Sequence, residues 1–280
     1  MKLVLTLLVG QDDDDVAEAN VLFHLNAGAD VVLAAVANRD VAEALSSLDE
    51  RVRVEHAAGS GGDVRTRLAR QAVTEHGADW VISGDARDFW WPRGENLKEV
   101  LAPIPERYTI VQGLRRELFF APGEGPLQER STLRRSLEHA STPGDTALLR
   151  PVFRADAEVV VQSGHAVELR RSVPLRGWYP IEIMSAAREV ATDDDEDLVE
   201  DTRLRDALLA LRSGQVPLTF RVPDIVEDAR YAVECAAVGE VDLPRLEQYV
   251  TELERRVDWL EQRFWPRVIR RLASLARRPS

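Results

Sequence analysis

The chain has 280 residues, of which 45% are hydrophobic and 30% charged, and its formal net charge is −12. This length is sufficient for one large α/β domain with an appendage, and the negative charge argues against nucleic acid as a partner. The single cysteine, Cys235, excludes an internal disulfide framework and a cysteine-based zinc cluster, which favours a cytoplasmic location.

Apolar runs alternate with helix-like segments over the first 85 residues. Residues 2–9 form a continuous apolar run typical of a central parallel strand, and the run is too short for a signal peptide with its cleavage site. Helical spacing predicts a helix over 16–27 that stops at Gly28. Further strands are predicted over 30–37, over 52–54 and from 80, and further helices over 40–48 and 64–75. This alternation predicts a parallel sheet with right-handed crossovers.

The second half of the chain changes character. Beyond Pro92 we expect the sheet to become mixed, with strands over 108–114 and 117–120. Residues 193–202 are nearly all acidic and predict a hinge. Residues 203–280 predict a helical tail, in which apolar residues over 243–264 recur at spacings of three and four. That spacing predicts a coiled coil or a helix hairpin, and therefore a route to homo-oligomers.

The chain closes on a basic segment. Residues 267–278 contain five arginines and no acid, with apolar residues between them. Such a helix can lie on an anionic membrane surface or bind an acidic partner, which would make the protein peripheral at the inner membrane surface. It can equally be a solvated helix, or one that packs on the acidic surface of its own chain. No segment approaches the roughly 18 apolar residues of a membrane-spanning helix.

Charged and aromatic side chains gather over residues 79–92. Asp85 and Asp88 come directly after a buried strand, with Arg87 between them and Trp90 close behind. In open α/β sheets, ligands bind outside the carboxyl ends of the strands. Two carboxylates there suit a hard divalent cation that holds a phosphate. The alternative is a polar turn that caps the next element.

Residues 75–82 and 85–90 resemble the metal-binding stretch of family 2 glycosyltransferases of the GT-A fold. That family carries Asp-x-Asp at this place, and the motif binds Mn²⁺ or Mg²⁺ on the diphosphate of a nucleotide-sugar. The resemblance implies a GT-A-like α/β domain over 1–192, with a mixed sheet flanked by helices, and Asp85 as a metal ligand. Arg87 stands where the second Asp is expected, and Asp88 lies one place later, so the motif is degenerate. We assign Arg87, Asp88 and Trp90 to substrate binding.

The first loop and a helix extend the resemblance. Residues 12–20 are similar to the first loop of the family, which implies that Asp13 contacts the donor, although Gln11 replaces the usual Arg. Arg67 and Arg70 match the basic helix beside the nucleotide. Without the resemblance, these two arginines would be interpreted as a solvated helix face. The family also places an Asp after the second strand, and here Val36 replaces it.

Two later segments supply the remaining candidates. Residues 149–167 are similar to the segment that ends in a Gly-Asn-His triplet, which implies His165 as a second metal ligand. The alternative is a structural histidine. Residues 174–184 also match, and Glu182 is the candidate catalytic carboxylate near the acceptor. If Glu182 points outward from a strand, it is merely solvated. Ser185 follows where the family continues with a His-Phe-Pro-like turn.

The resemblance implies inverting transfer of a sugar from a nucleotide-sugar to an acceptor, with an altered metal site. An acidic side chain would deprotonate the acceptor, and positive charge would stabilise the departing diphosphate. Arg87 could itself supply that charge, because a guanidinium binds phosphate oxygens in bidentate geometry. The acceptor, whether a small molecule, a glycan or a carrier-bound group, stays open.

The alternative function is a non-catalytic or repurposed member of the fold that binds a ligand or a partner. Four positions in the expected nucleotide and metal pocket depart from the family pattern, and the fold alone does not fix function. These positions are Gln11, Val36, Arg87 and Ser185.

Overall fold

The structure, a computed structural model, describes residues 1–11, 13–120, 130–135, 149–163, 166–175, 180–190, 198–218 and 220. The chain divides into two compact units, Met1–Ala232 and Val233–Ser280. Every described residue belongs to the first unit. The predicted coiled-coil seam over 243–264 and the basic segment over 267–278 therefore lie outside the described residues.

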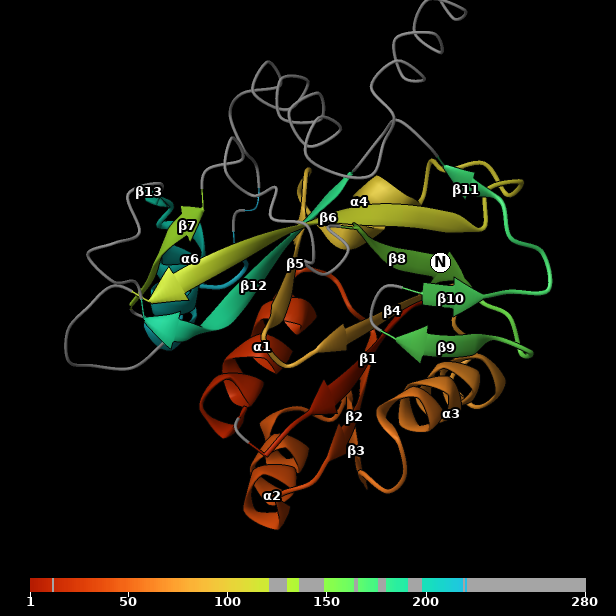
Figure 1. The fold of residues 1–280 in the computed structure, drawn as a ribbon, viewed down its shortest axis with the longest axis horizontal. Helices are drawn as coiled ribbons and strands as arrows, with labels where there is room; N and C mark the ends of the chain where they lie inside the picture. Colours follow the sequence, from red (N-terminus) through yellow and green to blue (C-terminus); the bar gives the residue numbers. More distant parts are fainter. Residues whose placement is uncertain are drawn as a thin grey trace, which may run out of the picture. The chain divides into compact units, whose positions relative to one another are not determined.

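The amino-terminal half is a parallel sheet with helical crossovers, as the alternating pattern predicts (Figure 1). Its elements are β1 (Leu3–Val9), α1 (Asp14–Asn26), β2 (Val31–Val36), α2 (Arg39–Leu48), β3 (Val52–His56), α3 (Gly61–Thr74) and β4 (Trp80–Asp85). Strand β1 pairs in parallel with β2 and with β4, and β2 pairs in parallel with β3. The carboxyl ends of these strands therefore meet at one edge of the sheet.

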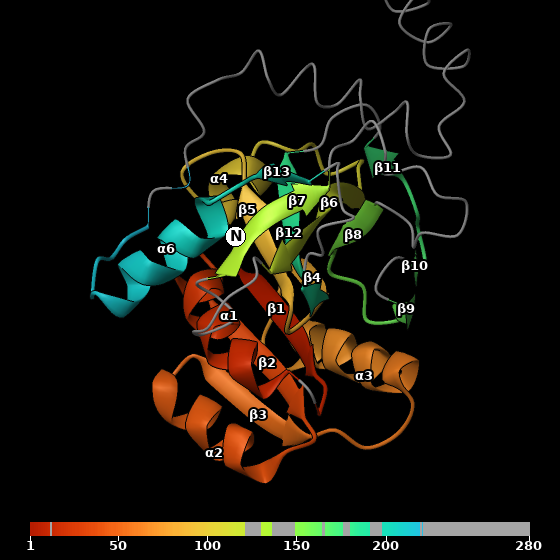
Figure 2. The same ribbon diagram turned by 60° about the vertical axis from the view of Figure 1, so that its left-hand side comes forward.

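Strand β1 is apolar throughout because both of its faces are buried. Leu3, Leu5 and Leu7 belong to the core cluster that α1 and α2 help to fill, whereas Val4 belongs to the cluster that α3 covers. This alternation follows from the period of two along a strand. Figure 2 shows the result, with α1 and α2 on one side of the parallel strands and α3 on the other.

Two caps account for helix boundaries. Ser60 precedes α3, and its side chain accepts a hydrogen bond from the backbone N–H of Asp63. Asn38 does the same for α2 with the N–H of Asp40. Such caps satisfy backbone donors that have no partner within the helix. Gly28, with φ of 105°, follows α1 where a left-handed residue is needed.

The second half of the chain makes the sheet mixed. Its elements are β5 (Asp88–Pro92), α4 (Leu97–Leu101), β6 (Ile110–Phe120), β7 (Ser131–Arg135), β8 (Leu149–Arg154), β9 (Val160–Ser163), β10 (Ala166–Glu168), β11 (Pro174–Leu175), β12 (Ile181–Val190), β13 (Leu198–Glu200) and α6 (Arg203–Arg212). The described strands follow the order β13-β7-β6-β8-β4-β1-β2-β3. Strand β12 runs between β6 and β5, and β9 with β10 forms a separate ribbon. The predicted mixed sheet flanked by helices is confirmed.

One expectation about strands was wrong. Residues 108–114 and 117–120 were expected as separate strands, but Ile110–Phe120 is one strand, because β12 pairs along its length from Gly113 onward. The expected hinge over 193–202 contains a strand in its described part, since β13 pairs with β7. The expected tail also contributes to the core, because Leu204 of α6 and Phe220 are buried in the main apolar cluster.

None of the described helices is long and apolar enough to cross a bilayer.

Candidate functional site

Two Asp–Arg pairs lie at the carboxyl ends of β1 and β4. Asp13 follows β1 and accepts a hydrogen bond of 2.7 Å from Arg87 Nε, and it also accepts one from the N–H of Gly10. Asp85 is the last residue of β4 and pairs with Arg65 of α3. Leu8 lies opposite Asp85 in the β1–β4 register, so the parallel pairing of the two strands places both pairs at the same edge of the sheet.

The two pairs differ in exposure. The side chains of Asp13 and Arg87 are 7% and 11% exposed, so this pair is largely removed from solvent. The Asp85 side chain is 46% exposed, whereas its partner Arg65 is 9% exposed. Asp85 is therefore the carboxylate of the two that solvent reaches.

A second polar group surrounds Asp88, the first residue of β5. Ser185 of β12 lies directly opposite Asp88 and hydrogen bonds to its carboxylate. Arg115 of β6 donates to Ser185 Oγ at 2.9 Å and lies 4.0 Å from the Asp88 carboxylate. Burial, together with the charge of Asp85, raises the pKa of Asp88 against the opposing influence of Ser185, Arg115 and Arg150. A carboxyl group whose pKa is raised toward neutrality is suited to proton transfer.

The donor set does not fit a divalent metal ion. A site for a hard divalent cation needs carboxylates that face the ion, but Arg65 neutralises Asp85 and Arg87 neutralises Asp13. Arg87 is itself a cation where a ligand is expected. Within the described part of the chain, no three His, Cys, Asp or Glu side chains are grouped so as to hold a metal. His165, the other predicted ligand, lies outside the described residues.

Glu182 does not belong to this site. It lies three residues before Ser185 on β12, and residues three apart on a strand point to opposite faces. Glu182 accepts hydrogen bonds from Arg203 at 2.9 and 3.0 Å and forms an ion pair with Arg116. Burial alone would raise its pKa, but Arg116 and Arg203 lower it below the ordinary value. Glu182, predicted as the catalytic carboxylate, is therefore 2% exposed, lies between two guanidiniums and points to the face of β12 opposite that of Ser185.

Trp90, which the sequence assigned to substrate binding, lies in the interior of the structure. Its side chain is 0% exposed and packs into the core. Gly84 and Gly113 make room for it, since a Cβ atom at Gly84 would lie 2.8 Å from Trp90 Nε1 and one at Gly113 would lie 3.0 Å from its ring. The indole is thus a packing element and not a platform for a nucleotide or sugar.

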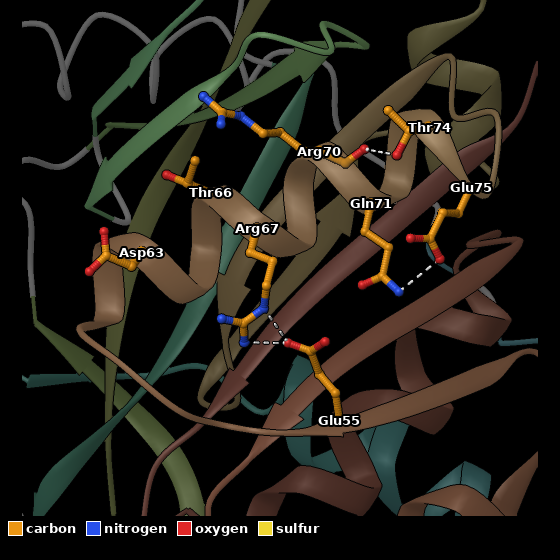
Figure 3. A pocket seen from close by; sticks show the side chains of 8 residues that line it. All are labelled: Glu55, Asp63, Thr66, Arg67, Arg70, Gln71, Thr74 and Glu75. Carbon is orange, nitrogen blue, oxygen red and sulfur yellow. Dashed lines mark hydrogen bonds and ion pairs between the residues drawn. The ribbon is translucent and has the colours of Figure 1, made fainter.

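Arg67 and Arg70 lie on the outer face of α3. Both residues line a polar pocket of about 560 Å³ beside α3. Figure 3 shows Arg67 directed toward Glu55 of β3, whereas Arg70 points away from that strand. Arg67 binds Glu55, and Arg70 donates to the carbonyl of Val159. The face of α3 that packs on the sheet instead carries Arg65, together with Val64, Leu68, Ala69 and Ala72. The helix therefore contributes Arg65 to the site, whereas Arg67 and Arg70, assigned to substrate binding from the sequence, line the pocket on the outer face of the helix.

The sequence contains one signal for Arg65, a site residue that the motifs did not assign. Arg65 precedes Leu68, Ala69 and Ala72 by three, four and seven positions, which is the inward stripe of an amphipathic helix. No comparable signal pointed to Arg115 or Arg150. Those two meet Asp88 only because β6 and β8 pair with each other and β12 pairs with β6.

Comparisons with known proteins leave the function open. No family model matches the chain, and no curated protein sequence matches it. Matching solved structures include a CMP:2-keto-3-deoxy-manno-octonic acid synthetase complexed with CTP, at 12% identity and a TM-score of 0.32, over 77% of this chain and 100% of that one. Another is a proposed glucose-1-phosphate thymidylyltransferase from Bacillus anthracis in complex with sucrose, at 11% identity and a TM-score of 0.28, over 83% of each chain. At these TM-scores the likeness is too slight to decide function.

Proposed function

We propose that the chain binds a nucleotide-sugar at the carboxyl ends of β1 and β4 and transfers the sugar to an acceptor with inversion. The observation that carries the proposal is the position of Asp13, Asp85 and Arg87, which meet at the edge of the sheet where open α/β sheets bind ligands. The strand order and the resemblance of residues 75–90 support the same interpretation.

In this proposal, guanidiniums take the role of the metal. Arg65 and Arg87 bind the diphosphate by exchanging part of their contact with Asp85 and Asp13 for phosphate oxygens. A guanidinium matches phosphate geometry and stays charged at any physiological pH. It therefore stabilises the negative charge that develops on the leaving diphosphate.

Asp88 is the carboxylate that we assign to the acceptor. The acceptor oxygen attacks the anomeric carbon, the bond from that carbon to the diphosphate breaks, and the acceptor proton passes to Asp88. Burial raises the pKa of Asp88, which makes its carboxylate a stronger base than an exposed aspartate. Ser185 and Arg115 orient it through the contacts described above.

The direct test is binding and turnover with and without manganese. UDP, GDP and dTDP, with their glucose and mannose conjugates, would be titrated calorimetrically into the protein. We expect one nucleotide to bind without manganese, and Arg65→Ala and Arg87→Ala to weaken it at least about tenfold. Arg51→Ala is the control, because Arg51 pairs with Asp49 directly before β3 begins, at the amino-terminal edge of the parallel strands. Binding that strictly requires manganese would contradict the role of the arginines.

A second candidate is a ligand- or partner-binding protein that does no chemistry. The observation that favours it is Glu182, since the family-based catalytic carboxylate is buried and paired with Arg116 and Arg203. The same titrations separate the two candidates. Nucleotide binding with no release of sugar, whichever acceptor is added, would support a protein that only binds its ligand. In that case, Asp88→Asn should change no measured property of the complex between protein and ligand.

A further inference from the structure

Strand β5 carries the site residue Asp88, and among the described strands it has a partner on only one side. It pairs with β12, in the register Asp88 to Ser185, Phe89 to Met184 and Trp90 to Ile183. In an antiparallel pair, alternate residues direct both backbone groups to the partner, and the residues between them direct theirs away. The carbonyl of Asp88 and the N–H of Trp90 share one side, and they require partners from another element.

Helix α1 supplies both partners from its side chains. Asn20 Nδ2 donates to the carbonyl oxygen of Asp88 at 2.9 Å. One turn later, His24 Nε2 accepts from the N–H of Trp90 at 3.0 Å. Because Nε2 accepts, the proton lies on His24 Nδ1, which donates to the Asn20 carbonyl at 2.8 Å. Two side chains of α1 thus form the hydrogen bonds to the backbone of β5 that a neighbouring strand would otherwise form.

These contacts lie in the interior, where their loss would lower the stability of the folded state. Asn20 and His24 are both 0% exposed, and His24 lies against the rings of Phe23 and Phe89. A buried polar group without a hydrogen-bond partner lowers the stability of the folded state by about 1–3 kcal/mol. Positions of β5 in which these two hydrogen bonds are broken are therefore disfavoured. Burial also lowers the pKa of His24 to about 4, which keeps the ring neutral and Nε2 able to accept at neutral pH.

The same helix also holds the other end of the turn between β4 and β5. Asp13, directly before α1, binds Arg87, and Asn20 binds the next residue along the chain at its carbonyl. We propose that Asn20 and His24 are positioning residues, which hold Asp88 and the adjacent Arg87 in place for the ligand. The identity of that ligand rests on the proposed function, whereas the positioning itself does not.

The test uses four variants of the full chain. Asn20→Leu removes the donor to Asp88, and His24→Phe removes the acceptor for Trp90, each at similar volume. His24→Gln keeps an acceptor at nearly the same reach and serves as the rescue variant. Thr109→Val is the matched control, because Thr109 also accepts from a backbone N–H and donates to a carbonyl. Thr109 immediately precedes β6 and is about 20 Å along the strand from Arg115.

Two readouts are taken at a temperature where every variant is folded, so that lower stability alone changes neither. The first is the titration of the Asp88 carboxyl, followed by NMR of its side-chain carbon. The second is the affinity for UDP and for inorganic pyrophosphate. In Asn20→Leu and His24→Phe we expect the pKa of Asp88 to fall toward its ordinary value, and the affinity to fall about tenfold.

His24→Gln and Thr109→Val should change neither readout by a comparable amount. If Asn20→Leu and His24→Phe lower the melting temperature but leave both readouts unchanged, the two residues are structural only and the positioning role is overturned. If the unmodified protein binds none of UDP, GDP, dTDP and pyrophosphate, the proposed function fails, and the Asp88 titration still decides the positioning role.

Discussion

At the scale of single residues, the site is defined by which cation each carboxylate meets. Arg87 replaces a carboxylate of the expected Asp-x-Asp motif and binds Asp13, while Arg65 binds Asp85. A guanidinium at 4 Å opposes a cation by roughly 4 kcal/mol per unit of charge at an effective dielectric constant of about 20. The residue change and the ion pairs therefore both disfavour a divalent metal.

Restoring the carboxylate should restore metal affinity. We expect Arg87→Asp to bind manganese at least about tenfold more tightly than the natural protein, because a carboxylate then replaces a guanidinium at the edge that carries Asp13 and Asp85. Calorimetric titration of manganese measures this gain. Arg87→Ala separates the loss of repulsion from the gain of a ligand, and adding Asp85→Ala to Arg87→Asp should abolish the gain. Tight manganese binding by the natural protein would contradict our interpretation of Arg87.

His24 makes stability depend on pH. Its pKa is lowered from 6.5 to about 4 in the folded protein, so below pH 6.5 the unfolded chain binds a proton that the folded chain does not. The free energy of unfolding should fall as the pH falls from 6.5, and the loss should level off below about 4, at on the order of 3 kcal/mol. Urea unfolding at a series of pH values measures it. In His24→Gln this part of the pH dependence should be absent.

At the scale of elements, strand alternation divides the polar residues of β12 between two environments. Ser185 faces Asp88 and Arg115, whereas Glu182 faces Arg203 and the ring of Trp91, over which the Arg203 guanidinium lies at 5.9 Å. Trp91 also donates from Nε1 to the carbonyl of Phe220. The Glu182 side of β12 thus attaches α6 and the segment that follows it to the sheet.

Removing the charge of Glu182 should therefore lower stability and leave the affinity for the ligand unchanged. We expect Glu182→Gln to lower the free energy of unfolding by about 3 kcal/mol, because Arg116 and Arg203 each lose a buried counter-charge, although Asp201 still pairs with Arg203. Denaturant unfolding measures this loss, and nucleotide titration at low temperature should give an unchanged affinity. Loss of turnover in a fully folded Glu182→Gln sample would return Glu182 to the list of catalytic candidates.

At the scale of the whole molecule, the first compact unit extends past the predicted domain boundary. Residues 198–200 form an edge strand, and Leu204, Leu208 and Phe220 contribute to the main core cluster. A domain that ended at residue 192 would lose that apolar surface and the ion pair of Glu182 with Arg203. The functional unit therefore includes α6 and the chain to at least Phe220.

Truncation provides the test at this scale. We expect a chain ending at Ala232 to unfold cooperatively and to keep the nucleotide affinity of the full chain, since Met1–Ala232 is one compact unit. A chain ending at residue 192 should be unfolded or aggregated. Circular dichroism melts and calorimetry measure both properties, and sedimentation shows whether residues 233–280 supply an oligomer. Independent folding of the chain that ends at residue 192 would contradict the structural role of α6.

The sequence by itself determined the sheet and its polar edge. Continuous apolar strands alternate with helices from Leu3 to Asp85, and this pattern depends only on local periodicity and burial. The same pattern placed Asp85 at the carboxyl end of a buried strand, beside the end of β1 and the loop that carries Asp13. Such features can be predicted because each is specified within about ten consecutive residues.

Only the tertiary structure decided which side chains share the site. Asp88 meets Ser185, Arg115 and Arg150 because β5, β12, β6 and β8 are adjacent, although these strands are separated by up to about a hundred residues of chain. Glu182 was excluded because strand register sets the face to which a side chain points, and a shift of one residue reverses it. Register depends on long-range pairing, which local periodicity does not contain.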